Sequence, residues 1–313
     1  MNLVNSRVGF RSFLCSWVLV LGGCFSPSSD SDHAPQNSRK DSWATGRHEW
    51  TSHGLKRSFW LDVPESRAKD AALVFVFHGY TGSAESIRES SGFSAVAEEH
   101  GFVVAYPQGT IDSRGNAFFN VGYSFHQNSS VDDVRFVREL AAALVDDLGL
   151  NPNAIFSTGM SNGGDMSYFL ASRPDPFVRA IAPVAGTMMV AGHEGFIPRK
   201  RVPVMEVHGT DDSITRWAGD LEDADGWGAY FGTLDVMRLW TDGYELEHSE
   251  STPFSQRSSE QKPICLHRWW TSRDDTEVVL YEIQGGKHVW PESLGRKGIS
   301  LAEEIWMFLR KYE

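Results

Sequence analysis

The strongest constraint on the fold is a series of short runs that are apolar at every position. Leu73–Phe77 reads LVFVF, and Phe102–Tyr106 reads FVVAY. Further β-rich runs cover residues 154–158, 179–184, 203–208 and 277–283. A strand that is apolar on both faces must be covered on both faces, which is typical of a parallel sheet between two layers of helices.

Helical patterns fill the gaps between these runs. Residues 84–100 are expected to form one helix that ends at Gly101. Ser130 and Asp133 resemble a capping box at the start of a second helix, in which apolar residues recur every three or four positions up to Gly149. Two more helices are expected over 162–172 and 300–311. The alternation predicts an α/β fold, a mostly parallel, doubly wound sheet with helices on both faces.

Residues 1–23 are predicted to be a signal peptide, because Arg7 and Arg11 precede an apolar run that is too short to span a bilayer. The run ends in LGGC, which resembles the lipobox of bacterial lipoproteins, so Cys24 is the expected lipidation site. The alternative is ordinary signal cleavage with Cys24 incidental. Both predict export, and any membrane attachment is expected only through the lipid.

Residues 24–46 are rich in Ser, Pro, Asn and Asp, which predicts a flexible tether. Residues 47–313 then form one large domain. The net charge of −12 argues against a nucleic-acid partner. Of the three cysteines only Cys265 lies in this domain, so neither an internal disulfide nor a cysteine-rich zinc site is expected. No metal cluster, phosphate loop or dinucleotide fingerprint is present, so no cofactor is predicted.

The stretch GMSNGG, residues 159–164, follows the apolar run 154–158 and precedes a predicted helix. A Gly-x-Ser-x-Gly pattern between a strand and a helix is the nucleophile elbow, in which glycines permit a sharp turn around an exposed serine. The alternative is a glycine-rich turn in which Ser161 only caps the helix.

A nucleophilic serine needs an imidazole to take its proton and an acid to hold that imidazole. The run 203–208 is followed by Asp211 and Asp212, and the run 277–283 is followed by GGK and His288. The spacing leaves the choice between the two aspartates open. Each loop alone is typical of an ordinary surface turn, but together they follow the Ser, Asp, His order of α/β-hydrolases, which favours a catalytic triad.

Acyl transfer also needs donors for a developing oxyanion. The backbone N–H of Asn162, directly after the serine, is one expected donor. The N–H of Tyr80 is the other, since the glycine-flanked loop HGYTG follows the run 73–77. The alternative is that HGYTG forms only a tight turn between a strand and a loop, which would contain the same glycines.

Several blocks together resemble a known family: FHGYTGSAES, VDDVRFVREL, GMSNGGDMSYFLA, AIAPVAG, VHGTDDSI and GGKHVWP. They are similar to the secreted α/β-hydrolase esterases that include poly(3-hydroxybutyrate) depolymerases, feruloyl esterases and acetylxylan esterases, over roughly residues 70–310. The resemblance implies Ser161 as nucleophile, His288 as base and Asp212, rather than Asp211, as acid. It implies a structural role for the carboxylates of Asp132 and Asp133.

The chain departs from the family in two places. Asn120-Val121-Gly122-Tyr123 stands where the family has a cysteine, and the expected partner cysteine near residue 243 is missing, so Cys265 is predicted to be unpaired. Ser-Ile-Thr-Arg follows Asp212 in place of the usual Val-Pro-Tyr type. The resemblance therefore supports ester hydrolysis better than it supports any one ester.

Aromatic residues are frequent after Asp212, and Trp290, two positions beyond His288, is expected to line the substrate pocket. Trp240 is expected in the core. The polar stretch 241–261 is predicted to be an exposed loop that can edge or cover the cleft.

The favoured function is an exported serine esterase acting on feruloyl or acetyl esters of plant polysaccharide. Alternatives are a poly(3-hydroxybutyrate) or oligoester depolymerase, a peptidase on the same fold, and a non-catalytic ligand-binding surface lipoprotein.

Overall fold

A computed structural model describes residues 43–193, 196, 200–254 and 262–313, all within one compact unit that spans residues 39–313. The predicted signal peptide, Cys24 and most of the predicted tether lie outside the described residues. None of the helices in the described ranges is long and apolar enough to cross a bilayer.

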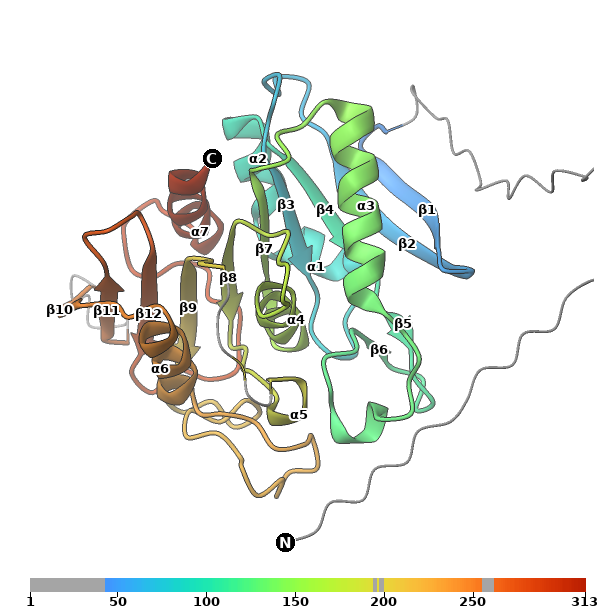
Figure 1. Ribbon diagram of the computed structural model, residues 1–313. Coiled ribbons are helices and arrows are strands. Elements are labelled where there is room, and N and C mark those ends of the chain that lie inside the picture. The colour runs from blue at the N-terminus through green and yellow to red at the C-terminus, as the bar shows by residue number, and fades with distance from the viewer. Residues whose placement is uncertain (1–42, 194–195, 197–199, 255–261) are drawn as a thin grey trace, which may run out of the picture. The chain divides into compact units, whose positions relative to one another are not determined.

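Ten strands form one sheet in the order β1-β2-β4-β3-β7-β8-β9-β12-β11-β10 (Figure 1). The strands are β1 Gly46–Ser52, β2 Leu55–Asp62, β3 Leu73–Phe77, β4 Val103–Pro107, β7 Ile155–Met160, β8 Ala180–Val184, β9 Val204–Gly209, β10 His248–Pro253, β11 Ile264–Trp270 and β12 Glu277–Ile283. The six strands from β4 to β12 in this order are parallel, and the pairs at both edges are antiparallel. Strands β5 Thr110–Ile111 and β6 Ala117–Phe118 form a separate pair.

Helices cover both faces of this sheet. They are α1 Ala84–Ser90, α2 Phe93–His100, α3 Asp133–Leu148, α4 Asn162–Ala171, α5 Val190–His193, α6 Thr233–Gly243 and α7 Leu301–Leu309, with 3₁₀ turns at Ser124–His126 and Arg310–Tyr312. Figure 1 shows α3, α4 and α6 on the side of the sheet nearer the viewer.

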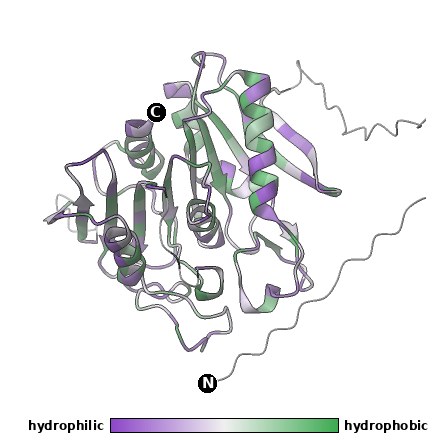
Figure 2. Cartoon of the chain, viewed as in Figure 1, coloured by the Kyte–Doolittle hydropathy of each residue, from purple (hydrophilic) through white to green (hydrophobic). Residues whose placement is uncertain are grey.

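Strand β3 shows why the apolar runs predicted this architecture. Leu73, Phe75 and Phe77 pack into a core with residues of α3, α4 and α6, whereas Val74 and Val76 pack into a second core with residues of α1, α2 and α7. Figure 2 shows the hydrophobic colour along the central strands. The predicted doubly wound α/β fold is thus confirmed, with both faces of the sheet buried.

The predicted helix over 84–100 is wrong, because it is two helices. Helix α1 ends at Ser90 and α2 begins at Phe93, and Gly92 between them has a φ of +82°. A residue in the left-handed region cannot continue an α-helix, so the chain turns there.

Helix α3 begins with a different cap from the one predicted. The side chain of Asp132, not Ser130, accepts a hydrogen bond from the N–H of Arg135 at 2.9 Å. The next residue, Asp133, is buried and pairs with Arg57 at 2.6 Å. Both carboxylates therefore have structural roles, as the resemblance implied.

The stretch 241–261 is not simply a loop. Its first residues end α6, and β10 pairs with β11 at the sheet edge, while residues 255–261 lie outside the described part. Every residue of β10 is exposed, so the strand carries no apolar alternation by which its sequence could reveal it.

The folded structure also includes residues that the sequence assigned to the tether. The indole N–H of Trp43 donates to Asp147 at 2.8 Å, and its ring lies 6.2 Å from Trp50 and 5.7 Å from Phe59. Strand β1 then begins at Gly46.

Candidate active site

Ser161 lies on a sharp turn between β7 and α4. Its backbone has φ 56° and ψ −121°, a conformation that costs energy for a residue with a Cβ atom and that persists at functional turns. Its N–H donates to the carbonyl of Val184 at 2.9 Å, and its carbonyl accepts from the N–H of Asp165 at 2.8 Å. The Ser161 side chain does not cap the helix, which speaks against the simple-turn alternative.

The glycines around Ser161 are required by close packing. A Cβ atom on Gly163 would lie 2.2 Å from the carbonyl oxygen of Phe77, and one on Gly159 would lie 2.6 Å from the same oxygen. Real Cβ contacts are not this short, so α4 approaches β3 only because both positions lack side chains. The packing of this elbow therefore requires glycine at positions 159 and 163.

Asp212 and His288 meet at the ends of neighbouring strands β9 and β12. His288 Nδ1 lies 2.7 Å from Asp212 Oδ2, and Asp212 Oδ1 accepts from the N–H groups of Ile214 at 2.8 Å and Thr215 at 3.0 Å. The Asp212 side chain is buried. Asp211 instead points to solvent and pairs with Lys287 at 3.2 Å. The structure thus pairs Asp212, not Asp211, with the histidine.

All three predicted residues stand at the carboxyl edge of the parallel strands β7, β9 and β12. Ser161 Oγ makes no hydrogen bond to His288 or to any other described residue. In enzymes without substrate, catalytic hydrogen bonds are often open and close only in the complex. Within the described residues the Asp212–His288 pair is formed, and Ser161 Oγ has no hydrogen-bond partner.

The loop after β3 lies directly beside the serine. A Cβ atom on Gly79 would be 3.4 Å from Ser161 Cβ and 4.0 Å from its Oγ. The backbone N–H groups of Tyr80 and Asn162 donate no hydrogen bond within the described residues. Both predicted oxyanion donors are thus free to bind a ligand oxygen.

Two side chains that the sequence analysis missed hold this loop. His78 Nδ1 lies 2.7 Å from the carbonyl of Gly79, and His78 Nε2 accepts from the N–H of Gly109 at 3.0 Å. Burial lowers the pKa of His78 to about 4, so the ring is neutral at pH 7 and can make both bonds. The Tyr80 hydroxyl donates to Asp112 at 2.7 Å.

A small pocket opens beside Ser161, with a volume of about 20 Å³. This is room for about one water molecule. Its lining residues, besides the serine, are Tyr123, Asp165, Thr187, Met189, Ile214, Thr215, Trp227 and Tyr230.

Asp165 is the unexpected member of this pocket. Its carboxylate accepts from the Tyr123 hydroxyl at 2.7 Å and from the N–H of Thr187 at 2.7 Å. Burial raises the pKa of Asp165 to about 7, although these two hydrogen bonds favour the ionised form. A carboxyl group in the first turn of a helix resembles an ordinary helix-start acid, so the sequence contained no signal for this position.

Trp290 does not line this pocket, so its contact with a substrate stays a prediction. Its ring lies 6.4 Å from Phe93 and packs against the core on the α2 and α7 side of the sheet. The aromatic residues that line this pocket are Tyr123, Trp227 and Tyr230. Trp240 is fully buried, as predicted, and no residue of 241–254 lines the pocket.

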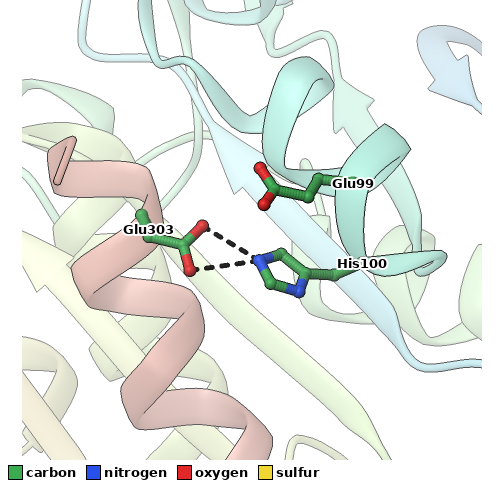
Figure 3. Close-up of side chains that lie close together, drawn as sticks. All are labelled: Glu99, His100 and Glu303. Atoms are coloured by element: carbon green, nitrogen blue, oxygen red, sulfur yellow. Dashed lines mark hydrogen bonds and ion pairs between the residues drawn. The ribbon is translucent and has the colours of Figure 1, made fainter. Parts of the chain in front are cut away.

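One group in the described part has the donor spacing of a metal site. The ligand atoms of Glu99, His100 and Glu303 lie within 4.8 Å of one another (Figure 3). His100 Nε2 is already 3.1 Å from both carboxylate oxygens of Glu303, which joins α2 to α7. None of these residues lines the pocket beside Ser161, so we interpret the group as a hydrogen-bonded contact between helices. Cys265, the cysteine within the described ranges, is free.

Known proteins are similar to this chain in sequence and in fold. The prolyl oligopeptidase family matches residues 90–198, about a third of the chain, including Ser161 but neither Asp212 nor His288. Two solved structures share the fold: an acetyl xylan esterase from Aspergillus awamori (TM-score 0.56, 13% identity, covering 78% of this chain and 94% of that one) and the Bacillus cereus carboxylesterase (TM-score 0.51, 10% identity, covering 82% and 95%). The fold is thus that of the α/β-hydrolases.

Three curated relatives are similar in sequence. A bifunctional acetylxylan esterase/xylanase of Neocallimastix patriciarum is 20% identical over 83% of this chain and 34% of its own length. Feruloyl esterase B of Piromyces equi is 25% identical over 78% and 42%, and poly(3-hydroxyalkanoate) depolymerase C of Paucimonas lemoignei is 28% identical over 57% and 41%. The chain therefore spans less than half the length of these relatives, whose names confirm the resemblance to the predicted esterase family.

Proposed function

We propose that this chain, an α/β-hydrolase with ester hydrolases among its curated relatives, is itself an exported serine esterase. The observation that carries the proposal is the 2.7 Å pair of the partly exposed His288 with the buried Asp212, formed at the same sheet edge as the strained Ser161. A ligand-binding protein without catalysis has no need of that pair or of a strained serine.

In the proposed reaction Ser161 Oγ attacks the ester carbonyl carbon while His288 takes its proton. Asp212 holds the imidazole and stabilises its positive charge. The N–H groups of Tyr80 and Asn162 bind the oxyanion of the tetrahedral intermediate. His288 then protonates the departing alcohol, and a water molecule, deprotonated by the same histidine, releases the acid from the acyl-enzyme.

The volume of the pocket favours a short acyl group. The space of about 20 Å³ beside Ser161 has room for an acetyl methyl group, whereas a feruloyl ring would extend beyond it toward the open side of the pocket. Curated relatives are named acetylxylan esterases, and others are named feruloyl esterases, so the names by themselves favour neither acyl group. Because of the pocket volume, we propose acetyl esters of polysaccharide as the substrate class, with feruloyl and 3-hydroxybutyrate esters as the alternatives to be tested.

Export rests on the sequence of residues 1–23, and attachment to a membrane rests on Cys24. Both are proposals about segments outside the described residues. A lipid label that Cys24→Ala abolishes, without loss of export, is the expected result. If the protein is exported but never carries the lipid label, it is an ordinary secreted enzyme without a lipid anchor.

The test of the reaction is the initial rate of p-nitrophenyl acetate hydrolysis by wild type and Ser161→Ala. We expect the substitution to lower kcat by at least about 1,000-fold, because the nucleophile is lost. Ser172→Ala, at the other end of α4, is the matched control and should retain the wild-type rate. The hydrolysis rates of methyl ferulate, acetylated xylan and 3-hydroxybutyrate oligomers then show which acyl group the enzyme prefers. A folded wild type without any esterase activity would refute the proposal.

A further inference from the structure

A row of four ionisable side chains extends from His288 into the protein. Asp212 Oδ2 lies 2.7 Å from His288 Nδ1 and 3.6 Å from Nε2 of a second histidine, His208. The other ring nitrogen of His208, Nδ1, lies 2.9 Å from Glu206 Oε1. The side chains of Glu206, His208 and Asp212 are at most 1% exposed. Asp212 is therefore flanked by two imidazoles.

The hydrogen bonds of His208 indicate which of its nitrogens carry protons. Nε2 lies 2.9 Å from the carbonyl oxygen of Thr215, which can only accept, so Nε2 is protonated. Burial raises the pKa of Glu206, but its carboxylate accepts from the N–H of Gly186 at 3.2 Å and from the Tyr168 hydroxyl at 2.9 Å, and both hydrogen bonds favour the ionised form. Nδ1 therefore also donates, to Glu206. An imidazole that donates from both nitrogens is an imidazolium cation.

The titratable groups around His208 come from four parts of the fold. They are Asp165 and Tyr168 of α4, Glu206 of β9, Asp212 after β9, and His288 after β12. Burial disfavours the charged ring, but the hydrogen bond and charge of Glu206, the Thr215 carbonyl and the charge of Asp212 together raise the pKa of His208 above its ordinary value. The exposed pair of Lys287 and Asp211 lies nearby and is neutral overall.

We propose that His208, which donates from both ring nitrogens, is a positively charged positioning residue that acts through Asp212 and extends the working range of the esterase toward acidic pH. The idea rests on the proposed function. A proton on His288 is attracted by Asp212 and repelled by a cation on the far side of Asp212. Removing that cation takes away this repulsion, and the variant below measures the effect.

The first test is the pH dependence of kcat/KM for p-nitrophenyl acetate in wild type and His208→Gln. The expected result is an acid limb that moves to higher pH by roughly one unit, because one nearby like charge is removed. His193→Gln is the matched control. It also removes a buried imidazole, but burial lowers the pKa of His193 to about 4, so no charge is lost and the limb should stay in place. A uniform loss of rate in His208→Gln without a shift would indicate a merely structural role and overturn the proposal.

The second test needs neither activity nor a variant. ¹⁵N NMR of the histidine rings in wild-type protein at pH 7 should show both nitrogens of His208 protonated, with His78 and His193 neutral in the same spectrum. A neutral His208 would overturn the proposal even if the variants do not fold. An inactive wild type with a charged His208 would refute the esterase function alone.

Discussion

Asp165 is a carboxylic acid at a position that would suit an uncharged group. It is buried beside Ser161, and both of its oxygens already accept hydrogen bonds, from Tyr123 and Thr187. Because its pKa is raised from the model-peptide value of 3.8 to about 7, the folded protein binds this proton more tightly than the unfolded chain. The protonated Asp165 therefore contributes its full stabilisation of the folded state below about pH 4. This contribution is lost as the pH rises through 7.

Asp165→Asn should therefore have a stability advantage that grows with pH. The amide keeps an acceptor for Thr187 and offers a donor to the Tyr123 oxygen, while it removes the buried charge. We expect the Tm of the variant relative to wild type to increase between pH 5 and pH 9, as measured by circular dichroism. Tm values that stay parallel over this range would show that Asp165 is not protonated near neutrality in the folded state.

At the level of elements, the site depends on how closely α4 packs on β3. Helix α4 points its N-terminus at the serine, and the free N–H of Asn162 belongs to its first turn. The two elements can approach because Gly159 and Gly163 have no side chains. The same approach brings the loop after β3, with Gly79, into contact with Ser161.

Gly163→Ala tests this contact. In an ordinary helix the change would stabilise by up to about 1 kcal/mol, but here the new methyl group meets the Phe77 carbonyl at 2.2 Å. We expect a net loss of about 1–3 kcal/mol in the free energy of unfolding, together with a lower kcat. Gly164→Ala is the comparison variant, because its Cβ atom would meet backbone at 3.0 Å, a tight but less severe contact, so its loss should be smaller. Equal urea midpoints for the two variants would contradict the packing argument.

The central elements could be predicted because burial on both faces leaves a visible pattern. Strands β3, β7 and β12 begin or end within a residue or two of the predicted bounds. The break at Gly92 and the strand β10 were missed for opposite reasons. A single glycine inside a helical pattern does not reveal its φ, and a strand exposed on both faces has no periodicity.

At the level of the whole domain, the fold needs residues that the composition assigned to a tether. Trp43 closes the outer end of the sheet against Trp50 and Phe59 and bonds to Asp147 on α3. Low apolar content predicts a tether only on average, and one indole is enough to extend the packed structure.

Trp43→Ala should accordingly destabilise the domain. Loss of a half-buried indole is expected to lower the free energy of unfolding by about 1–3 kcal/mol, less than for a fully buried tryptophan. A chain that begins at residue 47 should lose at least as much as the point variant, relative to one that begins at residue 43. Urea unfolding of the three proteins measures the difference, and identical midpoints would place the domain boundary at residue 47 after all.

The sequence alone determined the sheet class, the elbow at Ser161 and the loops that contain Asp212 and His288, because strand periodicity and glycine-rich turns are local signals. Only the tertiary structure decided what surrounds them. It packs Trp290 against Phe93 and leaves the pocket to Asp165 and Trp227, since the direction of a side chain depends on the elements packed beside it. It also brings Glu206, His208 and Asp212 into one buried row, a charge arrangement that depends on burial and distance rather than on the order of residues along the chain.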